Sequence, residues 1–276
     1  MSRPAFPILT WHSVNVRSHD YAGNDLLAFE QDLDTLHRRD WRIVSLDRAL
    51  DDLAHGQLAP RTAVLTADDG CLLDWEDFNH PTLGQQGNLR RILAEFKARN
   101  DESARHQVHL SAFVIASPAA RDELDRTDYQ GLGLWPDHWW ADANQSGLIS
   151  IESHSWDHNH GSLAETVQKD NRRGDFRWIA SESECRAEID QASAYIEQRS
   201  GRRPRYFAYP YGQSSDYLRE EYLPRFGADI GLKAALSCEP EPVTCASNPW
   251  HLPRYVCGRD WNSPEAFEQL LAEFER

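Results

Sequence analysis

Two short segments of this 276-residue chain carry side chains that could perform metal-assisted hydrolysis. Residues 66–70 read TADDG and follow the apolar run 63–65, so two adjacent carboxylates emerge where a glycine lets the chain turn. Residues 154–158 read HSWDH and follow the mostly apolar run 148–151. If the backbone coils there, the two imidazoles can share one cation. Two histidines and one aspartate leave a coordination position for water, as catalytic zinc-type sites do.

The spacing of the two histidines is weak evidence by itself, because the chain has 12 histidines and such a pair arises easily by chance. The location is stronger evidence. Each segment stands at the carboxyl end of a predicted strand, where the functional groups of α/β barrels and open α/β sheets gather. We therefore interpret the two segments as parts of one site.

Strand-like runs alternate with helical runs along the chain. The predicted strands are 7–12, 42–46, 63–66, 108–116, 148–153, 205–209, 229–236 and 252–256. The predicted helices are 26–38, 85–97, 183–200, 216–226 and 264–274, with Gly201 as the stop of the third and Ser263 as the cap of the last. Regular alternation of this kind predicts a parallel sheet closed as a barrel.

The composition fits one large α/β domain, residues 1–276, since 40% of the residues are apolar and 11% are aromatic. Acidic residues outnumber basic ones by 44 to 29, for a net charge of −15. Such a charge opposes binding to nucleic-acid phosphates or to anionic lipid, so we expect no nucleic-acid partner. Neutral or cationic partners fit the charge better.

The sequence also predicts a cytoplasmic protein without membrane insertion. No basic segment followed by an apolar stretch opens the chain, and no run of about 18 apolar residues occurs in it. Five cysteines, an odd number without paired zinc-ligand spacing, predict reduced thiols. A Cys238–Cys245 disulfide is the main alternative.

Two long segments, at about 117–147 and 161–181, interrupt the alternation and are interpreted as insertions near the site. The first contains three tryptophans that could form a platform for a sugar ring or could pack in the core, namely Trp135, Trp139 and Trp140. The second contains a basic patch that could hold an anionic group of the substrate or could be a solvated loop, with Arg172 and Arg173 as the favoured contacts.

The two chemistry-bearing segments resemble motifs of the polysaccharide deacetylases of carbohydrate esterase family 4, the NodB homology family. TADDG stands where that family has T-F-D-D-G, and HSWDH matches its H-[ST]-x-x-H. Residues 207–212, FAYPYG, correspond to its F-R-P-P-Y-G segment. The three motifs agree with the family in order and spacing, and the resemblance spans most of the chain. It implies a distorted (β/α) barrel of 7–8 mostly parallel strands.

The resemblance also implies roles for individual residues. Asp69, His154 and His158 correspond to the metal ligands, and Asp68 corresponds to the general base. The backbone N–H of Tyr211 would join the metal in stabilising the oxyanion. The implied cofactor is one divalent ion, with Zn²⁺ favoured and Co²⁺, Ni²⁺, Mn²⁺ or Fe²⁺ as alternatives.

The departing amine needs a proton, which most family members take from a histidine in a late Leu-x-x-His motif. This chain has no convincing late match. Residues 9–13, LTWHS, instead resemble the N-terminal segment of the rearranged subgroup that acts on poly-N-acetylglucosamine, in which an early histidine fills that role. The resemblance therefore implies His12 as the general acid, with His160 and then His251 as less favoured candidates and a packing or capping histidine as the alternative.

The chain departs from the family pattern within two of these motifs. Ala67 replaces the usual phenylalanine, and Ala208 stands where many members have an arginine that orients the base. The rearranged subgroup also lacks that arginine.

These observations together predict a metal-dependent hydrolase that removes an acetyl group from an N-acetylated sugar or polysaccharide. Hydrolysis of a small cyclic amide or ureide is an alternative, because the same fold serves that reaction too. A non-catalytic glycan-binding relative is a second alternative, which the presence of a base, a ligand set and a candidate acid disfavours.

Overall fold

A curled parallel sheet forms the centre of the computed structural model, which describes residues 4–100, 105–170 and 172–275. Among these residues, eight strands form the sheet, and seven of them follow one path. In order across the sheet they are β10 (Ala234–Leu236), β9 (Tyr206–Ala208), β8 (Ile149–Ser153), β7 (Leu110–Val114), β4 (Thr62–Ala67), β2 (Ile8–Trp11) and β12 (Tyr255–Val256). The eighth, β3 (Arg42–Ile43), pairs with the start of β4.

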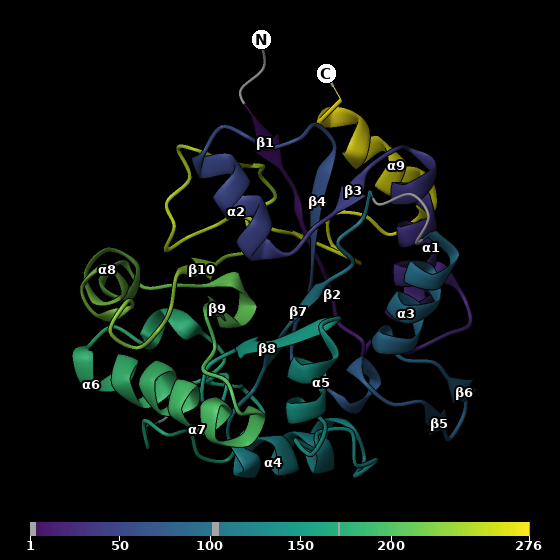
Figure 1. Cartoon of the computed structure of the whole chain (residues 1–276). Coiled ribbons are helices and arrows are strands. Elements are labelled where there is room, and N and C mark those ends of the chain that lie inside the picture. Colours follow the sequence, from purple (N-terminus) through teal and green to yellow (C-terminus); the bar gives the residue numbers. More distant parts are fainter. Residues whose placement is uncertain (1–3, 101–104, 171, 276) are drawn as a thin grey trace.

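The two edges of this sheet meet, which curls it into a distorted barrel (Figure 1). Leu252, three residues before β12, forms a parallel bridge with Leu236 at the end of β10. The Leu252 N–H donates to the carbonyl of Ala235, and the Ser237 N–H donates to the carbonyl of Leu252, both at 2.8 Å. The segment before β12 therefore closes the barrel, and the predicted (β/α) barrel is confirmed.

Both faces of the sheet are covered, as expected for parallel strands. All six residues of β4 are buried. Leu65 packs outward in a cluster with α1 (Asp25–Arg38), α3 (Leu89–Asn100) and α9 (Pro264–Glu273), whereas Val64 packs with residues of β2, β7, β9 and β10 on the other face. Alternate side chains of one strand thus hold the helices on and fill the barrel.

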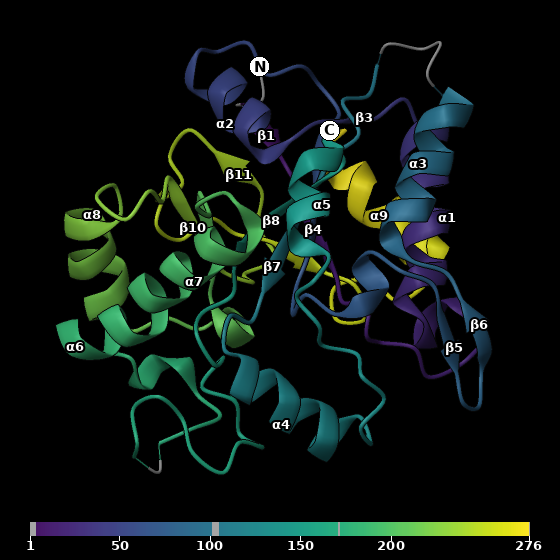
Figure 2. The ribbon, with the colours of Figure 1, turned by 60° about the horizontal axis from the view of Figure 1, so that its bottom comes forward.

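The remaining elements surround the sheet (Figures 1 and 2). The helices not yet named are α2 (Leu46–Ala54), α4 (Pro118–Asp128), α5 (Trp140–Ser146), α6 (Glu182–Cys185), η5 (Arg186–Asp190), α7 (Gln191–Ser200), η7 (Tyr217–Tyr222) and α8 (Leu223–Phe226). The short 3-10 turns are η1 (Tyr21–Gly23), η2 (Leu72–Asp74), η4 (Phe176–Trp178) and η6 (Pro210–Gly212). Two antiparallel pairs complete the fold, β1 (Ala5–Phe6) with β11 (Val243–Thr244) and β5 (Phe78–His80) with β6 (Gly84–Gln86).

The predicted helix ends are confirmed where capping chemistry marked them. Ser263 caps α9 by accepting from the Ala266 N–H, and Gly201 ends α7 with φ 75°. Three helices were not predicted. Of these, α2 begins within the predicted strand 42–46 because Ser45 caps it, and α4 and α5 lie in the segment 117–147 that was interpreted as an insertion. By contrast, the only helical element among the described residues of 161–181 is η4.

All five cysteines are unpaired in the structure, so the alternative Cys238–Cys245 disulfide is not formed. No helix within the described ranges combines the length and the apolar character needed to cross a bilayer.

Candidate active site

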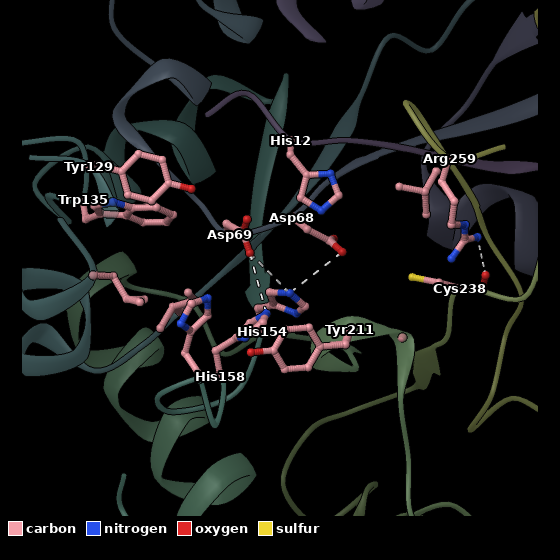
Figure 3. Close-up of a pocket in the computed structure, with 15 residues that line it drawn as sticks. His12, Asp68, Asp69, Tyr129, Trp135, His154, His158, Tyr211, Cys238 and Arg259 are labelled. Carbon is pink, nitrogen blue, oxygen red and sulfur yellow. Dashed lines mark hydrogen bonds and ion pairs between the residues drawn. The ribbon is translucent and has the colours of Figure 1, made fainter. Parts of the chain in front are cut away.

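A pocket of about 270 Å³ opens at the carboxyl ends of the strands (Figure 3). His12 reaches it from the end of β2, Asp68 and Asp69 from the end of β4, and His154 and His158 from the end of β8. The wall is completed on one side by Tyr129 and Trp135 and on the other by Cys238 and Arg259. The structure therefore brings together the five residues for which the sequence predicted metal binding and proton transfer.

Asp69, His154 and His158 form a compact donor set. Their ligand atoms all lie within 4.8 Å of one another. The Asp69 Oδ1 atom is 3.7 Å from Nε2 of His154 and 3.8 Å from Nε2 of His158. In the part of the chain that the structure describes, no other group of three such side chains shares this geometry.

The turn after β4 depends on glycine at position 70. Gly70 has φ +72°, and a Cβ placed on it would lie 2.4 Å from Cγ1 and 2.8 Å from Cα of Val114 in β7. Any side chain there would push β7 away from β4. Asp69 is itself left-handed at φ 75°. This tight turn is what presents two consecutive carboxylates at the mouth of the barrel.

The HSWDH segment is a turn rather than a helix. Ser155, His158 and Asn159 have left-handed φ values of 71°, 65° and 44°. Such conformations cost on the order of 1 kcal/mol or more each, so local hydrogen bonds must hold them. The Ser155 hydroxyl accepts from the His158 N–H, and Asp157 Oδ1 accepts from the Asn159 N–H, both at 2.9 Å. The two imidazoles are thereby fixed toward Asp69.

The surroundings of the donor set fit a divalent cation. His154 Nδ1 lies 2.8 Å from the carbonyl of Ala208, so this nitrogen donates and Nε2 keeps its lone pair for a metal. Burial lowers the pKa of His158, and the neighbouring His154 and His160 lower it further, which favours the neutral imidazole that metals bind. Two imidazoles and one carboxylate are the donors that Zn²⁺ takes in catalytic sites.

Asp68 is held by a buried arginine that the motifs did not reveal. Arg254 Nη1 and Nη2 donate to the two carboxylate oxygens of Asp68 at 2.7 and 2.8 Å, and Arg254 Nε donates to the Ser237 carbonyl. Arg254 is 0% exposed. Burial alone would raise the pKa of Asp68, but the charge of Arg254, followed by that of His154, and the paired hydrogen bonds outweigh it and lower the pKa to about 2. Asp68 is therefore ionised and fixed in orientation.

Arg254 takes the place of the arginine that many family members have at the position of Ala208. It comes from the predicted strand 252–256, and in the closed barrel this segment lies next to β10, the neighbour of β9. The only sign of this role in the sequence was an arginine within an otherwise apolar run. Such a run does not identify the carboxylate that the arginine binds.

His12 points into the pocket next to Asp68 (Figure 3). Its backbone N–H donates to Asp25 Oδ2 at 2.8 Å, which anchors the end of β2 to the start of α1. Its Nδ1 atom is buried and has no hydrogen-bond partner among residues 4–100, 105–170 and 172–275. Nδ1 of His12 therefore makes no capping hydrogen bond within these ranges. The placement of the side chain fits the predicted general acid.

The other two candidate acids are placed differently. His160 lines the same pocket, with its ring centroid 5.4 Å from that of His158, and its Nδ1 lies 3.9 Å from Asp128 Oδ2. His251 lies beside Tyr209 and pairs with Glu239, and it does not contribute to the pocket wall. His12 remains the favoured candidate, because it lies next to Asp68 (Figure 3).

Tyr211 also borders the pocket. It is left-handed at φ 58°, and its ring meets the edge of His158 at a centroid distance of 4.5 Å. The next residue, Gly212, packs so closely that a Cβ there would be 2.5 Å from Cβ of Cys238. This close approach places the Tyr211 backbone at the pocket wall. Oxyanion binding by its N–H stays a prediction.

The predicted tryptophan platform needs correction. Trp135 lines the pocket, but Trp139 and Trp140 are 0% exposed and belong to the hydrophobic core. Trp139 stacks on Trp75 at 6.3 Å, and Arg121 lies over Trp140. Trp139 and Trp140 therefore have no ring face to offer to a sugar, because other side chains already cover both.

The predicted basic patch is corrected too. Arg172 pairs with Asp170 and Glu184, each at 2.8 Å, and Arg173 donates to backbone carbonyls of its own segment. Neither arginine lines the pocket. The carboxylates and carbonyls of the loop thus satisfy these arginines, and nothing in their placement calls for an anionic group on the substrate.

The sequence profile described as polysaccharide deacetylase matches residues 55–224, more than half of the chain. A search of curated proteins gave no match. Among solved structures, the Streptococcus pyogenes deacetylase PplD in complex with acetate is similar over 98% of this chain and 99% of its own, with 16% identity and a TM-score of 0.66.

Two further structures are similar at the same level. IcaB from Ammonifex degensii matches 99% of this chain and 97% of its own, with 18% identity and a TM-score of 0.62. The BpsB deacetylase domain from Bordetella bronchiseptica matches 91% of this chain and 95% of its own, with 19% identity and a TM-score of 0.57. At these identities the likeness is one of fold. The profile match, on a barrel that brings the three motifs to one pocket, makes this protein a member of the polysaccharide deacetylase family.

Proposed function

We propose that this protein is a metal-dependent deacetylase that hydrolyses the acetamido group of an N-acetylated saccharide. The observation that carries the proposal is the position of a fixed, ionised base beside a metal-type donor set. Nε2 of His154 is 3.9 Å from Asp68 Oδ2 and 3.7 Å from Asp69 Oδ1. Two adjacent carboxylates thus face the same imidazole, and among the described residues an arginine binds only that of Asp68.

Asp69, His154 and His158 would hold the ion. When bound, a divalent ion polarises the acetyl carbonyl and makes a nearby water molecule more acidic. Zn²⁺ fits the two nitrogen donors and one oxygen donor, and Co²⁺, Ni²⁺, Mn²⁺ and Fe²⁺ can use the same set.

Asp68 would accept the proton of the attacking water. Because Arg254 grips both carboxylate oxygens, the carboxylate cannot rotate away, and burial excludes competing solvent from it. Arg254 acts through Asp68 and is therefore a positioning residue. The low pKa of Asp68 keeps it in the basic form at every ordinary working pH.

His12 would give its proton to the departing amine. It enters the pocket from β2, whereas the donor set is carried by β4 and β8, so it can approach the acetamido nitrogen from the side of the base. The backbone N–H of Tyr211 would face the developing negative charge on the carbonyl oxygen.

The test is acetate release from protein stripped of metal with a chelator and reloaded with one ion at a time. We expect acetate from N-acetylglucosamine oligomers only after reloading. A cyclic ureide is assayed in parallel, and turnover of the ureide without acetate release would assign the site to cyclic amides instead. Saturable binding of the oligomer to metal-loaded protein, with no acetate formed, would make the protein a glycan-binding relative.

A further inference from the structure

The two histidines of the donor set are held in different ways. His154 Nδ1 donates to the carbonyl of Ala208, so a hydrogen bond orients its ring. His158 Nδ1 is buried and has no hydrogen-bond partner in any other residue that the structure describes. Metal-ligating histidines usually have such a partner, which fixes the ring and supports binding of the ion. The orientation of His158 therefore depends on the backbone turn that carries it.

This turn lies against a buried carboxyl group from outside the three motifs. Glu188 is 0% exposed and comes from η5, a turn of π-helix between α6 and α7. Its Oε2 atom accepts from the backbone N–H groups of Trp156 and Asp157, at 3.2 and 3.4 Å. A buried carboxyl group is costly unless its oxygens are hydrogen-bonded, and the turn supplies these bonds. One side chain thus pairs with two consecutive N–H groups in the middle of the HSWDH turn.

Asp157 and Glu188 form a pair of buried carboxyl groups. Asp157 is 3% exposed, and the two side chains hydrogen bond to each other. A hydrogen bond between two carboxyl groups needs a proton on one of them. Burial, followed by the charge of Asp157, raises the pKa of Glu188 well above its usual range, so Glu188 carries that proton. The pair therefore behaves as one hydrogen-bonded unit behind the turn.

The long segment 161–181 is tied to the same pair. The Val167 N–H donates to Asp157 Oδ2. The Gln168 side-chain amide donates to Glu188 Oε1 at 3.4 Å. Neither carboxyl group lines the catalytic pocket, so the pair acts on the site only through the turn.

We propose that Glu188 is a positioning residue of the metal site, which through the turn 155–159 sets the orientation of the His158 imidazole and with it the affinity for the ion. The inference rests on the proposed function, because it assumes that the donor set holds an ion. Loss of Glu188 leaves two backbone N–H groups unpaired, in a turn whose left-handed residues depend on such bonds. The segment 161–181 has the role of holding the carboxyl pair in place.

The experiment measures the affinity of the protein for Zn²⁺ by competition with a chelating dye. Outer-shell partners of metal ligands typically contribute about 10- to 100-fold to metal affinity, so we expect Glu188→Ala to bind Zn²⁺ at least about tenfold more weakly. Glu188→Gln should bind Zn²⁺ nearly as the wild type does, because the amide keeps an acceptor for the two N–H groups and a donor for Asp157. The visible absorption bands of bound Co²⁺ should change in Glu188→Ala and not in Glu188→Gln.

Glu152→Ala is the matched control. Glu152 is also 0% exposed, and its Oε2 atom also accepts from two consecutive backbone N–H groups, those of Arg205 and Tyr206 at 2.6 and 3.0 Å. These groups lie at the start of β9 and outside the turn 155–159. We expect Glu152→Ala to lower the unfolding temperature of metal-free protein, as Glu188→Ala does, but to bind Zn²⁺ as the wild type does.

Glu188→Asp replaces Glu188→Ala if the latter does not fold, because its carboxyl group is one methylene too short to keep both N–H contacts. Wild-type Zn²⁺ affinity in whichever of these two variants folds would overturn the positioning role, as would equal losses of affinity in that variant and in Glu152→Ala. Acetate release tests the proposed function separately. A wild type that binds Zn²⁺ through a Glu188-dependent site but releases no acetate would overturn that function and leave the positioning role standing.

Discussion

The catalytic pocket has two sides, a metal side with the proposed metal ligands and a base side with the proposed base. Local motifs predicted the metal side, whereas the partner of the base comes from a distant segment of the chain. On the metal side, Asp69 faces two imidazoles, its side chain is 21% exposed, and no arginine contacts it within the described residues. On the base side, Asp68 is 4% exposed and is gripped at both oxygens by Arg254. Two carboxylates that are neighbours in the chain therefore have opposite surroundings.

The surroundings of the two aspartates, and not their residue type, therefore distinguish their proposed roles. Asp69 faces the Nε2 atoms of two imidazoles, and one carboxylate with two such nitrogen donors is an arrangement that a cation completes. Asp68 is already paired with the cationic Arg254, which suits the proposed role of proton acceptor better than that of a metal ligand. The tight turn at Gly70 follows directly after both carboxylates.

The strongest test of this comparison is to remove one side chain from each side of the pocket. His154→Ala should abolish metal binding, and activity should fall to the level of metal-free protein. Asp68→Asn should retain the metal with nearly unchanged affinity but lower kcat by about 10³-fold, because only the base is lost. Metal content after dialysis and acetate release give both readouts. Equal metal loss in the two variants would show that Asp68 is a ligand as well.

The next largest effect concerns Arg254. Arg254→Met leaves a buried carboxylate without its partner, which should cost about 3–5 kcal/mol of unfolding free energy, and Arg254→Met with Asp68→Asn should regain much of it. Denaturant unfolding of both variants measures this coupling. If the single and double variants were equally unstable, Arg254 would matter for packing and not for the charge of Asp68.

The same variant has a pH signature. The wild-type pKa of Asp68 lies below that of an unfolded aspartate, so the ion pair stabilises the fold above about pH 4, and this stabilisation is lost as the pH falls toward 2. In Arg254→Met the burial of Asp68 is no longer offset, so its pKa should rise. Activity of the variant should then fall at an acidic pH where the wild type is still active. Unchanged acid limbs in the kcat/KM profiles would contradict this account.

The smallest of these effects separates His12 from the metal side. His12→Ala should slow amide cleavage about 10²-fold more than cleavage of 4-nitrophenyl acetate, whose leaving group departs without protonation. Metal content should not change, because His12 is not in the donor set. Equal slowing of both substrates would assign His12 to substrate positioning and not to proton donation.

Most of the fold and of the metal side could be predicted because the signals are local. Apolar runs mark the strands, and each motif directly follows one, so the convergence of Asp69, His154 and His158 follows from the parallel sheet alone. His12 needed the resemblance to the rearranged subgroup. His12 lies near Asp68 because β2 pairs with β4, and the local sequence of neither strand reveals this pairing.

The parts that sequence reasoning missed depend on contacts between distant segments. Arg254 meets Asp68 only after the barrel closes, so no local pattern marks it. Trp139 and Trp140 were expected at the substrate as readily as in the core, because a large aromatic ring suits both places and only packing decides. Arg172 pairs with Glu184, which lies twelve positions later and outside the loop, so the sequence of the loop alone does not reveal this partner.

The closing segment of the barrel has a consequence for how the protein is made. Arg254 lies two residues after Leu252, whose bridge to Leu236 of β10 joins the two edges of the sheet. On the ribosome, the three proposed metal ligands are therefore synthesised long before the guanidinium that holds Asp68. We expect the protein to acquire activity only after the segment that carries Leu252 and Arg254 has been added and has closed the barrel.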